Sequence, residues 1–281
     1  MGFGLTLQGN GLRRDRLVHA GLFHDVDCFK VARLFRWTLP LSNFPSLIFN
    51  HCLNIAQRAF DLLLPAQCVL CGSAADRHGL CPGCRHDLPR ADGPRCRLCA
   101  VALGSGDCCG DCLHHAPGFD HCLAACRYDW PLDALIPAFK YGGDLSLARP
   151  LASLLAERVA QAERPDLLLA LPLHPQRQRQ RGFNQSLLLA RLVGARLGLP
   201  LDRRVLLRQR PTPPQASQSR AERRRAMRNA FTARRRLDGL HVVVVDDVMT
   251  SGASLDAAAR ALKAAGARRV DGWVVARADR L

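Results

Sequence analysis

Residues 241–254 read HVVVVDDVMTSGAS, and this stretch decides the fold of the chain. It begins with four consecutive valines, a β-branched run without polar residues that is typical of a strand buried on both faces of a parallel sheet. We expect the strand to stop at two adjacent carboxylates, Asp246 and Asp247. Small and hydroxyl-bearing residues follow, and a helical pattern begins at Leu255. This order predicts an anion site, because N–H groups at a helix N-terminus bind phosphate while carboxylates face sugar hydroxyls or a metal.

The same residues resemble the phosphoribosyl-pyrophosphate (PRPP) loop of type I phosphoribosyltransferases, in which an aliphatic run, two acids and a turn of Thr/Ser-Gly-x-Ser/Thr bind ribose 5-phosphate. A simpler interpretation is that the aspartates only cap the following helix. Capping needs one acid, however, and explains neither the second acid nor the hydroxyl-rich turn. The resemblance implies catalytic roles for Asp246 and Asp247, and phosphate binding by Thr250, Ser251, Gly252, Ala253 and Ser254.

The chain carries a large positive charge. It has 281 residues, a formal net charge of +16 and a pI of about 10.1, and only Lys30, Lys140 and Lys263 among its 40 basic residues are lysine. The length allows one α/β domain of about 150 residues or more together with a smaller module. The charge favours phosphate-bearing partners, but it does not distinguish PRPP from single-stranded DNA, RNA or anionic lipid.

Residues 1–49 show no periodic pattern and are predicted to be a poorly ordered extension. Charged residues interrupt every apolar run, so we find neither a secretory signal nor about 18 consecutive apolar residues, and we expect a cytoplasmic protein without a membrane span. From Asn50, apolar residues recur at helical spacing until Pro65. This pattern predicts an amphipathic helix over residues 50–66 that docks on the next domain.

Eight of the thirteen cysteines form four Cys-x-x-Cys pairs in a module that we place at residues 67–117. Two such pairs complete a tetrahedral shell of four thiolates, the geometry that structural zinc takes, so eight ligands predict two structural Zn²⁺ ions. Sequential pairing would give two zinc ribbons in tandem, and a crossed pairing stays open. The predicted ligands are Cys68, Cys71, Cys81, Cys84, Cys96, Cys99, Cys109 and Cys112.

A disulfide scaffold or a redox motif would use the same spacing. A disulfide framework needs an oxidising compartment, and the sequence lacks a secretion signal. Closed four-thiolate sites leave no position for a substrate, so we expect the metal to fold the module and not to react. Cys108 is an alternative ligand beside the last pair. The cysteines without partner spacing fit small apolar residues, and they are Cys28, Cys52, Cys122 and Cys126.

Residues 166–173, DLLLALPL, predict a second buried strand, which is followed by the basic stretch HPQRQRQRGFNQS. In a doubly wound sheet the loops after two central strands face each other across the switch point. One loop then carries acids and hydroxyls, and the other carries arginines. We predict that Arg179 and Arg181 bind the pyrophosphate of PRPP with its Mg²⁺. For His174 a capping role and a functional one are equally favoured, and Lys140 is either a phosphate ligand or a solvated residue at a helix end.

Residues 203–236 contain 12 arginines and one acid. A long loop of this kind in a compact domain is typical of a lid or a binding segment, although a solvated basic face would have the same composition. We predict that Arg223 in this segment binds phosphate. Aromatic residues are nearly absent, so the segment favours phosphate tracking over base stacking.

The whole arrangement resembles the ComF family, which includes GntX-like proteins. The resemblance implies an α/β, phosphoribosyltransferase-type (Rossmann-like) fold with a mostly parallel sheet over residues 118–281, preceded by a Cys-rich double zinc ribbon. One departure is Ala226, where the family often has asparagine. The resemblance covers residues 50–277 and is carried by the cysteine pairs, FKYGG at 139–143, RGFNQS at 181–186, Thr212, Gln215, Ser219, Arg223, NAF at 229–231 and the stretch at 241–254.

Members of this family are associated with natural competence, so the resemblance implies a cytosolic PRPP-binding protein that supports the handling of imported single-stranded DNA beside a partner helicase. Two alternatives stay open. One is an active salvage-type phosphoribosyltransferase acting on a nucleobase or another nitrogen nucleophile, for which only Phe183, Phe231 and Trp273 are candidates to line a base site. The other is a basic nucleic-acid-binding module without PRPP chemistry.

Overall fold

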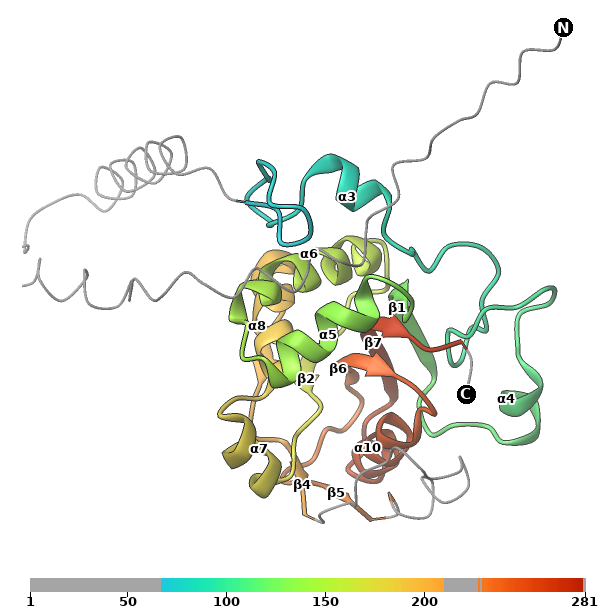
Figure 1. Ribbon diagram of the computed structural model, residues 1–281. Helices are drawn as coiled ribbons and strands as arrows, with labels where there is room; N and C mark the ends of the chain where they lie inside the picture. The colour runs from blue at the N-terminus through green and yellow to red at the C-terminus, as the bar shows by residue number, and fades with distance from the viewer. Residues whose placement is uncertain (1–66, 210–226, 228, 280–281) are drawn as a thin grey trace, which may run out of the picture.

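A computed structural model describes residues 67–209, 227 and 229–279 of the chain (Figure 1). The predicted extension over residues 1–49, the predicted helix over residues 50–66 and the predicted phosphate ligand Arg223 lie outside the described residues. The described elements form a layered α/β arrangement with two small cysteine-rich modules beside it.

A five-stranded parallel sheet with the strand order β1-β7-β6-β2-β3 forms the centre of the fold. The valine run lies in the middle strand, and residues 242–245 are 0% exposed, as β-branched residues buried on both faces of a sheet should be. The mostly parallel α/β fold expected from the sequence is therefore confirmed. The strands are β1 (His121–Arg127), β2 (Leu167–Ala170), β3 (Leu201–Asp202), β6 (His241–Met249) and β7 (Arg269–Arg277).

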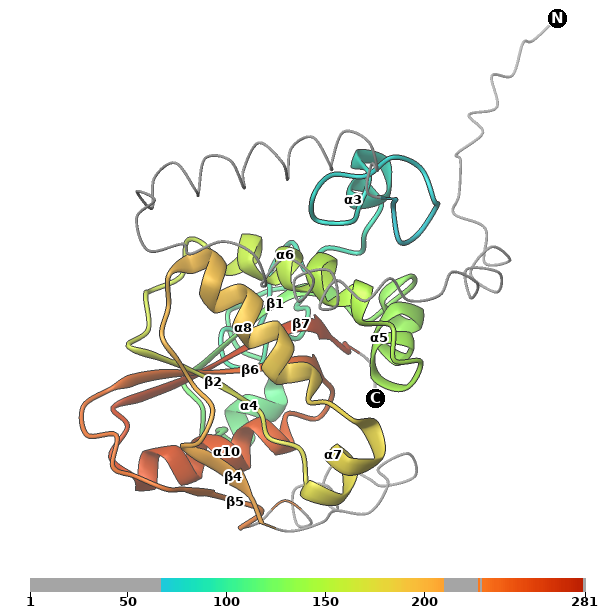
Figure 2. The same cartoon turned by 90° about the vertical axis from the view of Figure 1, so that its left-hand side faces the viewer.

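Helices cover both faces of the sheet (Figure 2). On one face α5 (Leu132–Tyr141), α6 (Ala148–Val159) and α8 (Gln185–Leu197) share a core with Val243 and Val245. On the other face α10 (Ala253–Ala264) shares a core with Val242 and Val244, because successive side chains of a strand point to opposite faces. Smaller elements are the one-turn helix η2 (Leu145–Leu147), α7 (Pro175–Arg181) and the antiparallel hairpin of β4 (Leu206–Arg208) and β5 (Phe231–Ala233).

The central strand is longer than the sequence predicts. Strand β6 does not stop at the aspartates but continues to Met249, and Asp246 and Val248 are paired with residues of β7. Strand β7 is equally long, so it provides backbone partners for the acidic residues. The two carboxylates therefore project from the rigid end of a paired strand and not from a loop.

The two cysteine-rich modules pack on opposite faces of the sheet. The first contains α3 (Pro82–His86), and its Leu80 and Leu88 join the core of α5, α6 and α8. The second contains α4 (Gly110–His114), and its Ala91 and Ala100 join the core on the side of α10. Figures 1 and 2 show α3 above α6 and α4 beside α10. Within the described residues we find no helix long and apolar enough to cross a bilayer.

Candidate functional site

The carboxyl ends of β2 and β6 open into a cavity of about 890 Å³. Its walls also come from α5, α7 and the first turns of α8 and α10. The edge at which parallel strands end is where α/β folds bind ligands. Most of the predicted site residues meet in this cavity, namely Lys140, Arg181, Asp246, Asp247, Thr250, Ser251, Gly252, Ala253 and Ser254.

The turn between β6 and α10 presents backbone donors. Gly252 has a φ of +75° and precedes α10, and a Cβ there would lie 3.1 Å from Met249 Cε, so glycine suits this position best. Ser251 Oγ accepts a hydrogen bond from the N–H of Ala253 at 3.4 Å. No group in the described parts of the chain accepts one from the N–H of Thr250, Ser251 or Gly252. Free N–H groups before a helix are the arrangement that binds phosphate.

The two carboxylates have different environments. The side chain of Asp247 is 3% exposed, and its Oδ1 lies 2.9 Å from Lys140 Nζ and accepts from the N–H of Val248 at 2.7 Å. Its Oδ2 is buried and has no hydrogen-bond partner among the described residues. Asp246 Oδ1 accepts from Ser186 Oγ at 2.8 Å and from the N–H of Asp247 at 2.9 Å. The orphaned oxygen of Asp247 is thus an acceptor for a ligand hydroxyl or a bound cation.

The neighbouring charges in this cluster influence the protonation of Asp246 and Lys140. Burial, and then the charge of Asp247, raise the pKa of Asp246 to about 7, against the opposing influence of Lys140 and Ser186. Burial alone would lower the pKa of Lys140, but the charges of Asp247 and Asp246 raise it above the ordinary value. Lys140 is therefore charged at neutral pH. The sequence alone leaves open whether Lys140 binds phosphate or is solvated at a helix end, and the structure shows it paired with Asp247.

Replacing Asp246 by asparagine is expected to stabilise the protein at pH 8 by about 2 kcal/mol, since the raised pKa means that burying the ionised carboxyl is unfavourable. Between about pH 4 and pH 7 the native state keeps a proton that the unfolded state releases, so stability falls as the pH rises through this window. The gain from Asp246→Asn should therefore be complete above pH 7 and absent below about pH 4. Urea unfolding of both proteins across this range measures it, and a gain independent of pH would contradict the assignment.

Helix α7 contributes the basic wall of the cavity. The sequence suggested an arginine-rich loop here, but His174 Nδ1 accepts from the N–H of Gln176 at 3.3 Å and caps a helix, so His174 has the capping role. Arg177 and Arg181 are four residues apart and both line the cavity. Arg179 is exposed and does not line it, because a residue two positions away points to another side of the helix.

Arg181 is held in place by two neighbours. Its Nη1 donates to Gln185 Oε1 at 2.7 Å, and its guanidinium lies 4.8 Å from the ring centroid of Tyr141. Gln185 is itself buried at the start of α8. The positive charge of Arg181 is therefore fixed in the wall of the cavity that the carboxylates also line.

Several lining residues were missed by the sequence analysis. Arg208 of β4 is 9% exposed, lies 5.6 Å from the ring centroid of Phe231 and lines the cavity. Burial, together with the charge of Arg177, lowers the pKa of Arg208. No local pattern could find Arg208, because it reaches the site only through the hairpin that pairs it with Phe231.

The aromatic lining also differs from the prediction. Of the three aromatic candidates Phe183 lines the cavity, whereas Trp273 is 2% exposed in the core and Phe231 lines a neighbouring cavity. Tyr128 and Tyr141 line the site and were not predicted.

The thiols gather in two groups, and the crossed pairing is absent. In each group the sulfur atoms lie within 4.8 Å of one another. The sulfurs of Cys71 and Cys81, and those of Cys99 and Cys109, are 3.6 Å apart. A disulfide bond would need about 2.05 Å, whereas sulfurs around tetrahedral zinc at about 2.3 Å are about 3.8 Å apart. The donor sets therefore fit structural zinc, and they are Cys68, Cys71, Cys81, Cys84 and Cys96, Cys99, Cys109, Cys112.

The remaining described cysteines lie outside these groups. Cys108 Sγ points to the carbonyl oxygen of Cys109 at 3.8 Å. Cys122 and Cys126 are 2% and 0% exposed and pack in the two cores as small apolar residues. Cys28 and Cys52 lie outside the described residues.

Known proteins share both parts of this chain. Its residues 59–113 match the double zinc ribbon domain family, and residues 184–280 match the phosphoribosyl transferase domain family. The chain is 33% identical over 225 residues to DNA utilization protein YhgH of Salmonella typhi, a match that covers 77% of this chain and 99% of that protein. It is 31% identical over 212 residues to Competence protein F of Haemophilus influenzae, a match that covers 72% of this chain and 92% of that protein.

A third relative is more distant. Competence protein ComFC of Bacillus subtilis is 26% identical over 218 residues, covering 74% of this chain and 83% of that protein. With the cysteine groups and the sheet edge described above, these matches show that the chain belongs to the ComF family, which joins a double zinc ribbon to a phosphoribosyltransferase domain.

Proposed function

We propose that this protein binds PRPP together with Mg²⁺ in the cavity at the carboxyl edge of the sheet, and that it thereby supports the handling of imported single-stranded DNA in natural competence. The observation that carries the proposal is the turn at residues 250–252, whose free N–H groups stand beside two acids on a rigid strand end. A ribose phosphate needs both kinds of group within a few ångströms of each other.

Each group of the cavity suits one part of PRPP. The 5-phosphate takes the N–H groups and hydroxyls of Thr250 and Ser251, and the ribose hydroxyls donate to Asp246 and Asp247. Mg²⁺, when bound, would neutralise the pyrophosphate and take carboxylate oxygens such as the orphaned Oδ2 of Asp247. Guanidinium groups from α7 and β4 supply further positive charge near the departing group, and they belong to Arg177, Arg181 and Arg208.

Substitution at the anomeric carbon of PRPP asks mainly for positioning and charge neutralisation, because the transition state resembles an oxocarbenium ion and the leaving group is anionic. A second candidate function is therefore transfer of ribose 5-phosphate to a nitrogen nucleophile. The exposed ring of Tyr141 and the ring of Phe183 at the cavity favour it, since they offer faces for a planar acceptor. Pyrophosphate release measured with a panel of nucleobases decides between binding alone and transfer.

The proposed partners and location of the protein rest on its net charge and on the names of its relatives. The formal charge of +16 favours a polyanionic partner. Two of the reported relatives are named competence proteins, which is the reason for the link to natural competence. The single-stranded DNA and the partner helicase are what the family resemblance implies. The cysteines of the described residues are free thiols, which fit the reducing cytoplasm, and we propose this location for the protein.

Titration calorimetry with PRPP and Mg²⁺ tests the proposal. Wild type should bind, and Asp246→Asn combined with Asp247→Asn should weaken binding at least about 100-fold through the loss of two carboxylate acceptors. Gly252→Ala should weaken it to a similar extent without changing charge, because φ at this position is +75°. Asp133→Asn, an exposed acid of α5, is the matched control and should bind as wild type does.

The alternatives give different results in the same assays. Absence of heat with wild type contradicts PRPP binding. If single-stranded DNA then binds with a steep salt dependence and without any response to PRPP, the protein is a basic nucleic-acid-binding module. If wild type binds PRPP but the Asp246→Asn, Asp247→Asn protein supports normal transformation in competent cells, the proposed link to DNA uptake fails.

A further inference from the structure

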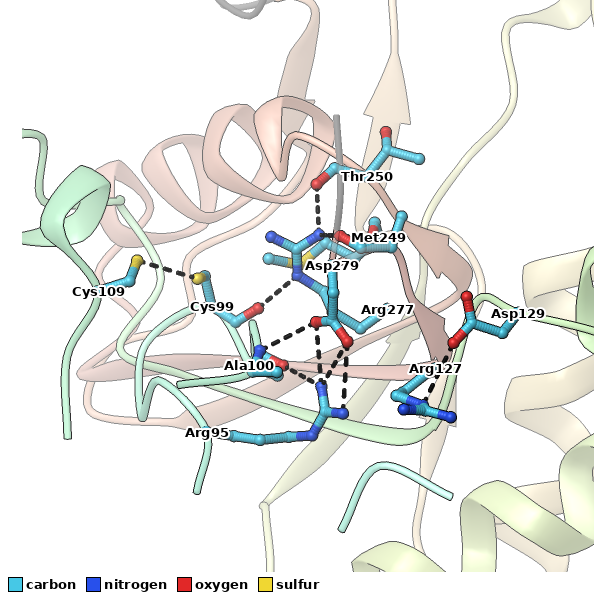
Figure 3. A network of polar contacts seen from close by, with 12 residues as sticks. Arg95, Cys99, Ala100, Cys109, Arg127, Asp129, Met249, Thr250, Arg277 and Asp279 are labelled. Carbon is cyan, nitrogen blue, oxygen red and sulfur yellow. Dashed lines mark hydrogen bonds and ion pairs between the residues drawn. The ribbon is translucent and has the colours of Figure 1, made fainter. Parts of the chain in front are cut away.

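A buried arginine joins the second cysteine group to the phosphate-binding turn (Figure 3). Arg277, the last residue of β7, is 4% exposed. Its Nε donates to the carbonyl oxygen of Cys99 at 2.7 Å, and its Nη1 donates to those of Met249 at 3.0 Å, Thr250 at 2.6 Å and Ala278. A single side chain thus links a predicted metal ligand with both residues that begin the turn.

The hydrogen bonds of Arg277 decide which way the turn presents its donors. A peptide unit is planar and trans, so its C=O and N–H groups point in opposite directions. Because the carbonyls of Met249 and Thr250 point to Arg277, the N–H groups of Thr250 and Ser251 point away from it. Arg277 does not line the PRPP cavity but the space behind the turn, so these N–H groups face the cavity.

Open space adjoins the turn on the side of Arg277. A second cavity of about 1120 Å³ lies behind it, and residues 251–253 line both cavities. A backbone segment with open space on two sides lacks the packing that fixes most of a protein interior. The carbonyl of Met249 also accepts from the N–H of Ala278 at 3.1 Å, whereas Arg277 is the one donor to the carbonyl of Thr250 within the described residues. The hydrogen bonds from Arg277 therefore fix the first peptide of the turn from behind.

The backbone of the second ribbon next to Cys99 is itself fixed by hydrogen bonds. Arg95 Nη1 donates to the carbonyl oxygen of Ala100 at 2.8 Å and lies 3.2 Å from Asp279 Oδ1, which also accepts from the N–H of Ala102 at 2.9 Å. Ala100 has a φ of +58°, an uncommon conformation for a residue with a Cβ, where the first ribbon has Gly72. The knuckle that carries Cys99 is thus held in one orientation, as Figure 3 shows.

The positive charge of Arg277 gives a metal ion in the second cysteine group a role in the contact between the ribbon and the turn. No carboxylate among the described residues forms an ion pair with Arg277, and a buried cation without an opposite charge is unfavourable. Four thiolates and one Zn²⁺ carry a formal net charge of about −2. A metal-loaded second group would therefore supply the missing negative charge beside the guanidinium.

We propose that the second zinc ribbon positions the phosphate-binding turn through Arg277, so that metal bound by Cys96, Cys99, Cys109 and Cys112 sets the anion affinity of the cavity. The claim about affinity rests on the proposed PRPP function, whereas the claim about order in the turn does not. The first ribbon is a built-in control, because it packs on α6 at the other face of the sheet and has no contact with the turn within the described residues.

The matched pair of variants is Cys109→Ser in the second ribbon and Cys71→Ser in the first. Each should lower the zinc content of the purified protein from about two ions to about one. Amide hydrogen exchange over residues 246–256 should become about tenfold faster in Cys109→Ser only, because the strand end and the first helical turn lose their anchor. Calorimetry should show about tenfold weaker PRPP binding in Cys109→Ser and unchanged binding in Cys71→Ser.

A second variant keeps the metal and removes the link. Arg277→Lys retains the charge but cannot donate to carbonyls on two sides at once, so it should raise exchange and weaken binding as Cys109→Ser does while holding two zinc ions. Arg127→Lys, an exposed arginine on the neighbouring strand that pairs with Asp129 at 3.3 Å, is its control. The double variant Cys109→Ser, Arg277→Lys should be no worse than either single one, since both interrupt one link.

Equal exchange over residues 246–256 in Cys71→Ser and Cys109→Ser, each lacking one zinc, would overturn the proposal. So would wild-type exchange in Arg277→Lys. If wild type binds no PRPP, the proposed function fails, and the exchange measurements alone still decide whether the second ribbon orders the turn.

Discussion

Removal of zinc by a strong chelator is expected to unfold both ribbons and to lower the melting temperature of the whole chain by more than about 10 °C, since structural zinc contributes about 10 kcal/mol to small domains. The ribbons are parts of the two cores of the sheet, so their loss exposes apolar surface on both faces. Burial raises the pKa of the thiols of Cys84, Cys99 (to about 11) and Cys112, so these groups are protonated without metal. Zinc must displace these protons, and its retention should weaken as the pH falls.

Metal analysis, a zinc-release assay at pH 5 to 8 and circular dichroism during chelation measure this expectation. Cys108→Ser is the control variant, because Cys108 neighbours a ligand but belongs to neither group. It should keep two zinc ions and the wild-type melting temperature. Loss of one ion from Cys108→Ser would show that the second ligand set is wrong.

Replacing Lys140 by methionine is expected to lower the free energy of unfolding by about 3 kcal/mol, because it leaves the ionised Asp247 buried without its partner. The carboxyl of Asp247 is 3% exposed and lies 2.9 Å from Lys140 Nζ. Its other oxygen already lacks a partner within the described residues, so the hydrogen bond from the N–H of Val248 would be the one that remains there. Adding Asp247→Asn to Lys140→Met should recover most of the stability, since it removes the unpaired charge.

Lys263→Met is the matched control for this prediction. Lys263 pairs with Asp120 at 2.6 Å, but both side chains are about one third exposed, so its loss should cost less than about 1 kcal/mol. Urea unfolding of the four proteins gives the comparison. Equal destabilisation by Lys140→Met and Lys263→Met would mean that the site cluster contributes no more than a surface pair.

The sequence predicts those features whose signal is local. The valine run, the two acids and the Gly252 turn are consecutive, and a buried strand followed by a helix brings them to one sheet edge without any further information. The cysteine groups are likewise set by short spacing. Helix α7 was missed because a run of Gln and Arg has no apolar face to reveal its period, and its capping residue, His174, is a rare one.

Other parts of the site depend on contacts between distant residues. Arg208 enters the cavity through a hairpin with β5, and Lys140 meets Asp247 only after α5 has packed on the sheet. Arg277 likewise carries no local signal in the sequence. Its hydrogen bonds join residues near positions 99, 250 and 278, which no periodic pattern relates.

The placement of the two ribbons on opposite faces has a consequence for how the polypeptide is divided. A fragment that starts at residue 118 would keep every strand of the sheet, yet it would leave apolar side chains of α6 uncovered on one side and those near α10 uncovered on the other. We therefore expect that the border at residue 117 separates two patterns in the sequence but not two units that fold alone.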